Sequence, residues 1–387
     1  MRRLLILVCA LVLFAAACSS SAKKAVNATT STTVADATAP STNGPRRTTT
    51  TTTPGSIDLY AADRPNNLSP VVKGFRSLVY VPNSLSDTVD VIDPATYQVV
   101  NHFAVGRLPQ HVVPSWDLKT LYVTNDLGNS LTPIDARTGA PGTPIPVLDP
   151  YNMYFTPDGK YAIVVAERFA RLDFRDPHTF KLHKALHVPC TGVDHMDFSA
   201  DGNSLVASCE FSGQVIQVDL RTQSVTGVMS LNGGRSKPQD VKIDPTGTRY
   251  YVADMVRGGV YEIDAKTFTV MKFIPPGKGA HGLYVTRDSK SMIVTNREAG
   301  SVSLLDFATD SGRTTWQIRG GGSPDMGGIS ADGKLLWVSG RYNGVVYVFD
   351  IATGALLHKI AVGSGPHGLA VYPQPGNYSL GHPGIFR

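Results

Sequence analysis

The sequence lacks the residue patterns that mark common enzyme active sites. It has no Gly-x-Ser-x-Gly segment, no Ser-His-Asp order, no glycine-rich phosphate loop and no Cys-x-x-Cys-His haem-attachment segment. These patterns place a nucleophile, a phosphate or a haem at a defined turn. Their absence gives no support for an α/β-hydrolase, a P-loop enzyme or a c-type cytochrome.

The sequence also lacks a long basic run after residue 54. The formal net charge is +5, from 36 Lys and Arg against 31 Asp and Glu. The first 54 positions contain six of the basic residues and only one of the acidic residues, so the rest of the chain has no net charge. Because nucleic-acid binding usually needs a clustered basic surface, we do not expect this protein to bind nucleic acid.

Cysteine is scarce, with four residues in 387. Cys9 lies in an apolar run, Leu4 to Ala17, that follows Arg2 and Arg3. The run has the length of a signal-peptide core and is too short to span a bilayer. We therefore expect an exported protein.

The second cysteine, Cys18, follows three alanines and precedes three serines. This arrangement resembles the lipobox of bacterial lipoproteins and implies a signal peptide over residues 1–18, lipidation of Cys18 and anchoring at the outer face of the cell membrane. Ala15 stands where a bulkier residue is usual. The alternative is ordinary cleavage near Ala17, which would leave Cys18 as a free thiol.

Residues 19–56 are rich in Thr, Ser, Ala and Pro and include an unbroken run of threonines, Thr48 to Thr53. Such a segment has too little apolar surface to offset the entropy of ordering the chain. We predict a disordered tether between the membrane and the folded domain.

An Asp-x-x-Thr segment recurs seven times, at intervals of 41 to 45 residues. Its aspartates are Asp93, Asp135, Asp176, Asp219, Asp264, Asp306 and Asp350. A period of this length, carried by short strands, is typical of a propeller or solenoid. An Asp at the start of a turn can accept backbone N–H bonds, and the Thr hydroxyl can help. We interpret the seven aspartates as turn residues, not as a catalytic or calcium-binding series.

Each period contains four strand-like segments, as at 121–125, 130–135, 143–148 and 153–156. The pattern predicts an all-β, seven-bladed β-propeller of four-stranded antiparallel blades over residues 77–376. The first unit lacks an innermost strand, and the last unit has a surplus one at 367–372. We therefore expect this C-terminal strand to pair with residues 78–81, complete blade one and close the ring. An N-terminal extended segment, 57–76, and a C-terminal tail, 377–387, flank the propeller.

The segment Leu121-Tyr-Val-Thr-Asn125 contains the tetrapeptide that names the YVTN β-propeller repeat family, with near-copies at 80–83, 251–254 and 293–296. The chain resembles that family, close to its YncE-like periplasmic and surface proteins, over about residues 75–375. The resemblance implies an exported seven-bladed propeller, often of unassigned function. The same architecture serves lactonases and redox proteins, so the fold does not decide the activity.

The two cysteines inside the propeller are Cys190 and Cys209. An exported chain with one remaining pair favours a disulfide. A turn at Asp201-Gly202 would bring the strand that ends near Cys209 back beside the residues that follow Cys190. We predict a disulfide between them, with two buried free thiols as the alternative.

A pair of residues precedes each predicted innermost strand and should lie at the mouth of the central channel. The pairs are Gln110-His111, Tyr151-Asn152, Asp194-His195, Gln239-Asp240, His281-Gly282, Asp325-Met326 and His367-Gly368. Alternation does not decide which member of each pair faces the channel. The candidate ligand-binding residues are His111, Asn152, Asp194, His195, Asp240, His281, Asp325 and His367.

Imidazole suits zinc, copper and iron, and carboxylates complete such sites. His195, His281 and His367 are the first-choice ligands if the mouth holds a divalent metal. The structural alternative is that polar residues satisfy backbone groups beside a wet channel.

A second polar ring is expected outward of these pairs, at the ends of the next strands. Its members are Asn83, Asn125, Glu167, Glu210, Asp254, Glu298 and Arg341. Because no catalytic set is recognisable, we expect a monomeric binding or interaction module for a protein, peptide or small molecule. The alternative is a metal-dependent or acid/base enzyme, an oxidoreductase or lactonase-like hydrolase, with its site at the channel mouth.

Overall fold

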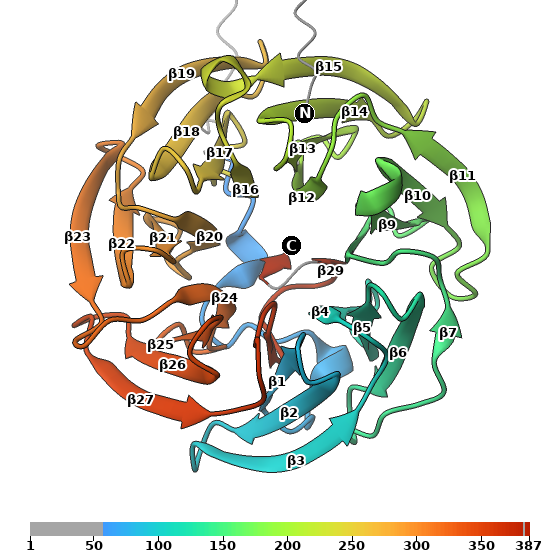
Figure 1. Cartoon of the computed structure of the whole chain (residues 1–387), viewed down its shortest axis with the longest axis vertical. Helices are drawn as coiled ribbons and strands as arrows, with labels where there is room; N and C mark the ends of the chain where they lie inside the picture. The colour runs from blue at the N-terminus through green and yellow to red at the C-terminus, as the bar shows by residue number, and fades with distance from the viewer. Residues whose placement is uncertain (1–56, 382–383) are drawn as a thin grey trace, which may run out of the picture. The chain divides into compact units, whose positions relative to one another are not determined.

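The computed structural model describes residues 57–381 and 384–387. The predicted signal peptide, the lipidation site at Cys18 and the tether lie outside these residues. Seven sheets surround a central channel in the described part of the chain (Figure 1). This arrangement confirms the predicted all-β, seven-bladed propeller with four-stranded antiparallel blades. No helix among the described residues has the length and apolar character needed to span a membrane.

Each blade runs from an inner strand beside the channel to an outer strand at the rim. The inner strands of blades 1 to 7 are β28 (Ala370–Tyr372), β4 (Pro109–Pro114), β8 (Asn152–Phe155), β12 (Val193–Phe198), β16 (Pro238–Ile243), β20 (Ala280–Val285) and β24 (Pro324–Ile329). The second strands are β1 (Leu78–Asn83), β5 (Thr120–Asn125), β9 (Ala162–Ala166), β13 (Ser204–Cys209), β17 (Arg249–Asp254), β21 (Ser291–Asn296) and β25 (Leu335–Gly340).

The outer half of each blade carries the repeated turn. The third strands are β2 (Thr88–Asp93), β6 (Ser130–Asp135), β10 (Arg171–Arg175), β14 (Gln214–Asp219), β18 (Gly259–Asp264), β22 (Ser301–Asp306) and β26 (Val345–Asp350). The outer strands are β3 (Gln98–Ala104), β7 (Ile145–Pro146), β11 (Leu182–His187), β15 (Ser224–Ser230), β19 (Thr269–Ile274), β23 (Ser311–Gln317) and β27 (Leu356–Ala361). Short 3-10 helices, also among the described residues, are η1 (Ala61–Asp63), η2 (Pro70–Val72), η3 (Glu167–Phe169) and η4 (Leu231–Gly234).

The core of the described domain lies between the blades, with one apolar cluster at each of the seven blade interfaces. Strand β1 shows how one strand serves two clusters. Leu78 and Tyr80 pack toward blade 2, whereas Val79 and Val81 pack toward blade 7. Because successive side chains of a strand point to opposite faces, a blade whose two faces are both covered needs apolar residues at consecutive positions.

The Asp-x-x-Thr segments form the turns between the third and outer strands. In six of the seven, the Asp carboxylate accepts hydrogen bonds from the backbone N–H and the hydroxyl of the Thr, as in Asp135, where these distances to Thr138 are 2.7 and 2.8 Å. In the first turn, Asp93 instead accepts from the N–H of Ala95 at 2.9 Å. The interpretation of these aspartates as turn residues is confirmed.

The ring closes through the C-terminal strand, as predicted. Strand β28 pairs with β1 in antiparallel register, with Leu78 opposite Tyr372 and Tyr80 opposite Ala370. Blade 1 therefore combines its inner strand from the end of the domain with three strands from its beginning (Figure 1). This pairing covers the edge that β1 would otherwise expose.

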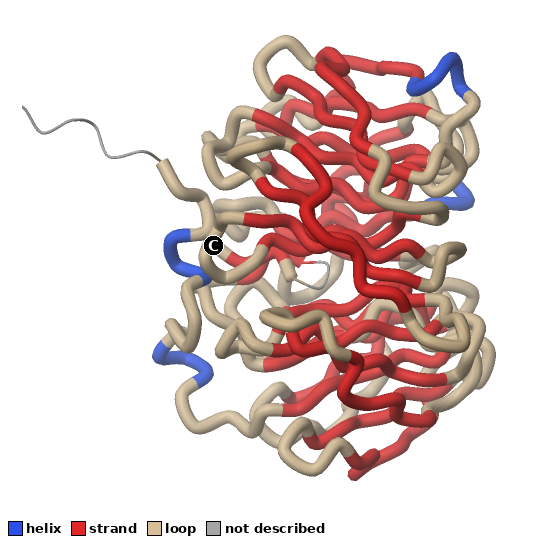
Figure 2. The backbone as a smooth tube through the Cα atoms, turned by 90° about the vertical axis from the view of Figure 1, so that its left-hand side faces the viewer, coloured by secondary structure: helices blue, strands red, loops and turns tan. Residues whose placement is uncertain are grey.

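The segments at both ends of the described chain lie at the end of the channel opposite the mouth (Figure 2). Leu59 donates its N–H to Pro245, and Ser379 donates to Trp116, both in turns that follow inner strands. Residues of the expected tail form β29 (Ser379–Gly381) and β30 (Ile385–Phe386), and β29 extends the sheet of blade 3 beyond its inner strand. Leu380, Ile385 and Phe386 are buried, so these segments close the far end of the channel.

The structure places a disulfide between Cys190 and Cys209, with 6.1 Å between their Cα atoms. Cys209 ends β13, and Cys190 lies in the connection that precedes β12. The bridge lies within blade 4 and fixes the entry to its inner strand.

Candidate functional site

Five of the seven mouth pairs lie in β-bulges. In the inner strands of blades 2, 4, 5, 6 and 7, the ladder to the second strand shifts register across the pair, for example between Val193 and Met196 in blade 4. A bulge adds one residue to one strand and re-aims its side chains. Both members of a pair can thus reach the mouth, which answers the question that alternation left open. In blade 7, Asp325 and Met326 both contact His281.

Four imidazoles surround the axis at the level of the bulges. The ring centroids of His111 and His195 are 5.4 Å apart, those of His195 and His281 6.4 Å, those of His281 and His367 6.2 Å, and those of His367 and His111 4.8 Å. Burial lowers the pKa of His111 to about 4 and the pKa values of His281 and His367 well below their usual value. These three histidines are neutral at pH 7, the form that binds metals.

Asp325 brings two of the histidines together. Its carboxylate oxygens lie 3.1 Å from His281 Nδ1 and 3.5 Å from His367 Nε2. One donor atom from each of these three residues lies within 4.8 Å of the others. Arg297 Nη1 and Arg341 Nε also approach Asp325, at 3.2 and 3.9 Å. Burial raises the pKa of Asp325, and the two guanidinium groups oppose that rise.

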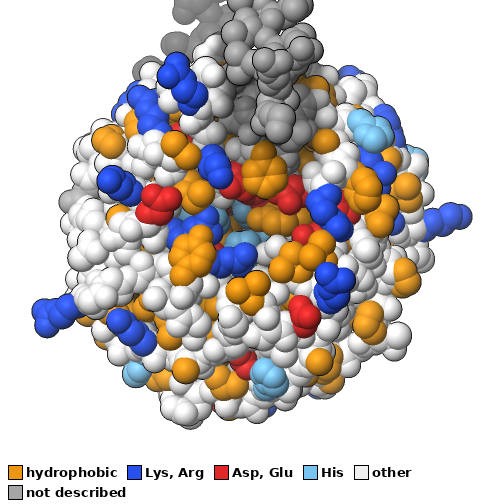
Figure 3. Space-filling view, viewed as in Figure 1, with side chains coloured by type: hydrophobic (Ala, Val, Ile, Leu, Met, Phe, Trp, Pro, Cys, Tyr) orange, Lys and Arg blue, Asp and Glu red, His pale blue; other side chains and the backbone are white. Residues whose placement is uncertain are grey.

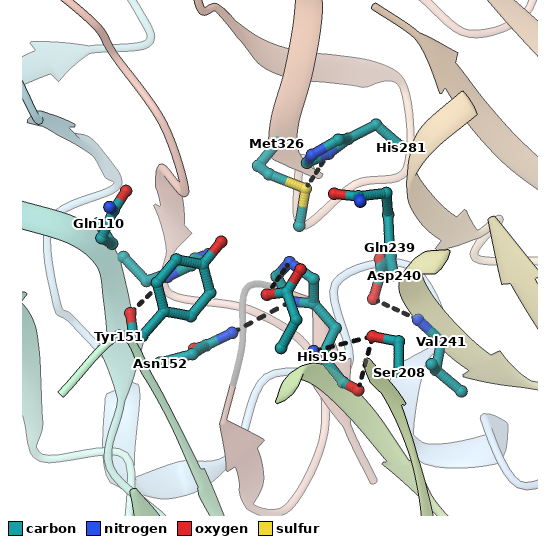
Figure 4. A network of polar contacts seen from close by, with 12 residues as sticks. Gln110, Tyr151, Asn152, His195, Ser208, Gln239, Asp240, Val241, His281 and Met326 are labelled. Atoms are coloured by element: carbon teal, nitrogen blue, oxygen red, sulfur yellow. Dashed lines mark hydrogen bonds and ion pairs between the residues drawn. The ribbon is translucent and has the colours of Figure 1, made fainter. Parts of the chain in front are cut away.

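His195, the third expected metal ligand, lies in a different group (Figure 4). Its Nδ1 is 3.1 Å from Asn152 Nδ2 and 3.3 Å from the Tyr154 hydroxyl, and its Nε2 is 3.1 Å from Asp194 Oδ1. The structure therefore divides the expected set: His281 and His367 meet at Asp325, and His195 meets Asp194.

His111 and Asp240 connect neighbouring blades. His111 Nδ1 is 3.0 Å from the carbonyl oxygen of Tyr151 in blade 3. Asp240 accepts hydrogen bonds from Lys242 Nζ at 3.1 Å and from the backbone N–H of Leu283 in blade 6 at 2.9 Å. Lys242 and Asp240 are both buried. These contacts give Asp240 a role in holding blades 5 and 6 together.

Some residues of the expected second ring face their own blades and not the mouth. Asn83 and Asn125 turn back into their own blades and donate to groups of the third strand, at 2.9 Å to Asp90 and Thr132. In blade 6 the equivalent residue is Asn296, which donates to Ser303 at 2.9 Å, and the expected member Glu298 is exposed two positions beyond it. Asp254 likewise accepts from the backbone N–H groups of Lys237 and Val256. These four are structural caps.

The residues that line the mouth follow directly after the second strands. We call them the mouth ring: Ser84, Asp126, Glu167, Glu210, Met255, Arg297 and Arg341. In six blades the mouth-ring residue donates its N–H to the carbonyl group two positions before the mouth pair, as Glu210 does to Gly192 at 2.7 Å and Arg341 to Ser323 at 3.1 Å. Blade 3 differs, because Glu167 begins η3.

Charge in the mouth ring is segregated. Blades 2, 3 and 4 contribute Asp126, Glu167 and Glu210, whereas blades 6 and 7 contribute Arg297 and Arg341. Figure 3 shows a hollow in the middle of this face, with histidines in its depth, acidic side chains mainly on one side and basic ones mainly on the other. Sequence reasoning found Glu167, Glu210 and Arg341 but missed Asp126 and Arg297. The residue after each second strand was the signal that could have found them.

Comparison with known proteins agrees with this architecture. Residues 65–374 match the model of the YncE-like β-propeller family, and the chain belongs to that family. No curated protein matches the chain.

Solved structures with the same fold include hydrazine synthase of Kuenenia stuttgartiensis, at 20% identity and a TM-score of 0.58 over 66% of this chain and 87% of that one. A candidate 6-phosphogluconolactonase from Bacteroides uniformis is 15% identical, with a TM-score of 0.62 over 76% of this chain and 98% of that one. A protein of unknown function from Desulfotomaculum acetoxidans is also 15% identical, with a TM-score of 0.63 over 76% and 98%. At these identities the likeness concerns the fold alone.

Proposed function

We propose that this protein is a membrane-tethered, extracytoplasmic binding module whose ligand enters the mouth of the central channel. The observation that carries the proposal is the variation of the mouth ring. A position with a purely structural role would repeat from blade to blade, as the Asp-x-x-Thr turn does. The mouth ring instead carries five different residue types at seven equivalent positions, with opposite charges on opposite sides.

The position of the first described residues supports a tether on the face opposite the mouth. The described chain begins on the face opposite the mouth, where Leu59 bonds Pro245. A lipid at Cys18, followed by the 19–56 tether, would therefore join the domain on that far face and leave the mouth directed away from the attachment point. Detergent phase partitioning tests the anchor: the wild-type chain should enter the detergent phase, and Cys18→Ser should remain in the aqueous phase.

A charge-reversal experiment tests the binding face. The double variant Glu210→Lys with Arg341→Glu reverses the charge at one acidic and one basic position of the mouth ring, whereas Lys334→Glu changes an exposed lysine in a turn of the far face. In capture from envelope extracts, a bound molecule should be retained by the wild type and Lys334→Glu and lost by the double variant. Retention by all three proteins would place the interaction elsewhere.

A metal site is the second candidate, because His281, Asp325 and His367 bring three donor groups together. The two guanidinium groups beside Asp325 argue against a metal site, since they already balance the charge of this carboxylate and would repel a metal cation. Elemental analysis of the purified protein tests this candidate. A full equivalent of zinc or copper that disappears in the His281→Ala and His367→Ala variants would favour a metal centre over simple ligand binding.

A further inference from the structure

Asp194 and Asp325 occupy the same position in blades 4 and 7. Each is the first member of its mouth pair, within the bulge of its inner strand, and each is fully buried. Each is flanked by the mouth-ring residue of its own blade and by that of the preceding blade. For Asp325 these neighbours are Arg341 and Arg297. For Asp194 they are Glu210 and Glu167.

The two buried carboxylates therefore have opposite surroundings. Asp325 has guanidinium nitrogens at 3.2 and 3.9 Å. Asp194 has one ion-pair contact among the described residues, with His195 Nε2 at 3.1 Å. Burial raises the pKa of Asp194, and the Tyr151 hydroxyl opposes the rise through a side-chain hydrogen bond. A buried carboxylate without a cationic partner is costly, and two further carboxylates beside it increase that cost.

The nearby cations do little to balance this acidic side of the mouth. Arg168 pairs with Asp149 and lies 3.6 Å from Asp126, so it is already shared between two carboxylates. Lys237 Nζ is 3.8 Å from Glu210 Oε1, but its side chain is 45% exposed. Contacts of that kind are strongly screened by water. The carboxyl groups of this side thus have few cations to balance them, and burial together with their mutual repulsion raises the pKa of Asp126 to about 7 and the pKa of Glu167 to about 8. A cation bound beside them would favour their ionised forms.

Aromatic side chains are exposed in the turns beside these carboxylates. Phe169 follows Glu167 by two positions and is 45% exposed, and Phe211 follows Glu210 directly and is 61% exposed. An aromatic face attracts a cation that lies over it, most strongly where water is partly excluded. The Phe169 ring already holds the guanidinium group of Arg171, with 5.5 Å between Arg171 Cζ and the ring centroid. Carboxyl groups beside exposed rings are a combination that suits an organic cation better than a hydrated metal ion.

We propose that Glu167 and Glu210, above the buried Asp194, bind an ammonium or guanidinium group whose apolar neighbours pack on Phe169 and Phe211. The group could belong to a free alkylamine or to a lysine or arginine side chain of a peptide. The inference rests on the proposed function, because it names the chemistry that the same mouth selects.

Isothermal titration of the purified full-length protein tests the proposal with matched probes. The cationic probes are butylamine, butylguanidine and the blocked tripeptides acetyl-Leu-Lys-Leu-amide and acetyl-Leu-Arg-Leu-amide; the comparison probes are butanol, butyrate and calcium chloride. At least one cationic probe should bind while butanol and butyrate do not. Tighter binding of the peptides than of the free amines would identify a peptide side chain as the source, and the reverse would identify a small amine.

Two sets of variants locate the binding. Glu210→Gln should weaken the cationic probe by about tenfold, since it removes a charge beside a partly buried site. Glu167→Gln should do the same above pH 8, where the Glu167 carboxyl, with its pKa of about 8, has lost its proton. Phe211→Ala should weaken it by a smaller factor. Glu298→Gln, an exposed carboxylate on the same face in blade 6, is the matched control and should bind as the wild type does. Circular dichroism melting of every variant verifies that it is folded.

The outcomes separate this inference from the proposed function. Binding of butyrate or of calcium alone, or cation binding that Glu298→Gln weakens as much as Glu210→Gln, would overturn the inference and leave a mouth that binds something else. Absence of binding by every cationic probe would also overturn it. If, in addition, the charge-reversed double variant captured the same molecules as the wild type, the proposed function would fail as well.

Discussion

The guanidinium group of Arg387, the last residue of the chain, lies over the ring of Tyr60, with 4.5 Å between Arg387 Cζ and the ring centroid. The same guanidinium group pairs with Asp197 of blade 4 at 3.1 Å. Tyr60 in turn donates its hydroxyl to the carbonyl of Ile243 in blade 5 at 2.8 Å. The two ends of the folded domain thus join at the far end of the channel and connect adjacent blades.

Replacing Arg387 with Ala should lower the free energy of unfolding by about 3 kcal/mol, because it leaves the carboxylate of Asp197 buried without a cation. Urea denaturation measures the change, and Lys334→Ala, at an exposed lysine, is the control. Deleting residues 365–387 should be far more damaging, since it also removes β28 and reopens the ring. A deletion variant that melts at the wild-type temperature would contradict the role assigned to this segment.

Removing the disulfide with Cys190→Ala and Cys209→Ala should destabilise the protein by about 3 kcal/mol, because the bond closes a short loop in the unfolded chain. Thiol titration of denatured, unreduced protein provides an independent check. The wild type and the double variant should show the same number of reactive thiols. Two additional thiols in the wild type would mean that Cys190 and Cys209 are not bonded.

The variant Asp240→Ala should cost about 3–5 kcal/mol of stability, because it leaves Lys242 unpaired in a site where 1% of that lysine side chain is exposed. Changing Lys242→Met in the same protein should recover a large part of the loss. A double-mutant cycle by urea denaturation measures the coupling. Additive effects of the two changes would show that the ion pair within β16 does not contribute to stability.

The stability of the protein should depend on pH through Glu167. Burial, followed by the nearby Glu210, Asp126 and Asp149, raises the pKa of Glu167 to about 8 from its usual 4.5, and Arg168 opposes the rise. The folded state therefore keeps a proton that the unfolded state loses above pH 4.5, so this group makes the protein less stable as pH rises from about 4.5 to 8.

In Glu167→Gln this loss is absent. The melting temperature of the variant relative to the wild type should therefore increase from about pH 4.5 to about pH 8 and then stay constant. The exposed Glu298→Gln serves as the control. Contributions from groups that do not interact with Glu167, such as the fall in stability below pH 6.5 that the low pKa of His111 produces, are common to both proteins and cancel in the difference. A difference that does not change with pH would contradict the assignment.

The repeated parts of the fold could be predicted from the sequence because they follow short-range rules. The turn at Asp135 is a local hydrogen-bond pattern, and the missing inner strand of the first unit required a partner from the end of the domain. The pairing of β29 with blade 3 could not be predicted, because its residues share no motif with the blades.

The candidate site was only partly predictable, and the reason is register. Strict alternation fails at the bulges, so it could not show that Asp325 and Met326 both reach His281. Asn125 and Asp126 are adjacent, yet one caps its own blade and the other belongs to the mouth ring. The carboxylate partners of the histidines depend on side-chain directions that the repeat does not encode. His195 meets Asp194 of its own mouth pair, whereas His281 and His367 both reach Asp325 of the blade between them.

The mouth ring has a consequence for evolution. Its seven side chains project from a backbone position that is held by the same main-chain hydrogen bond in six blades, so a substitution there keeps that bond. Some members contact each other across blades, as Arg341 does with Ser84 and Arg297 with Met255. The members without such contacts can change one at a time. New ligand preferences could arise in this lineage through single codon changes at a handful of sites, while the scaffold that displays them stays the same.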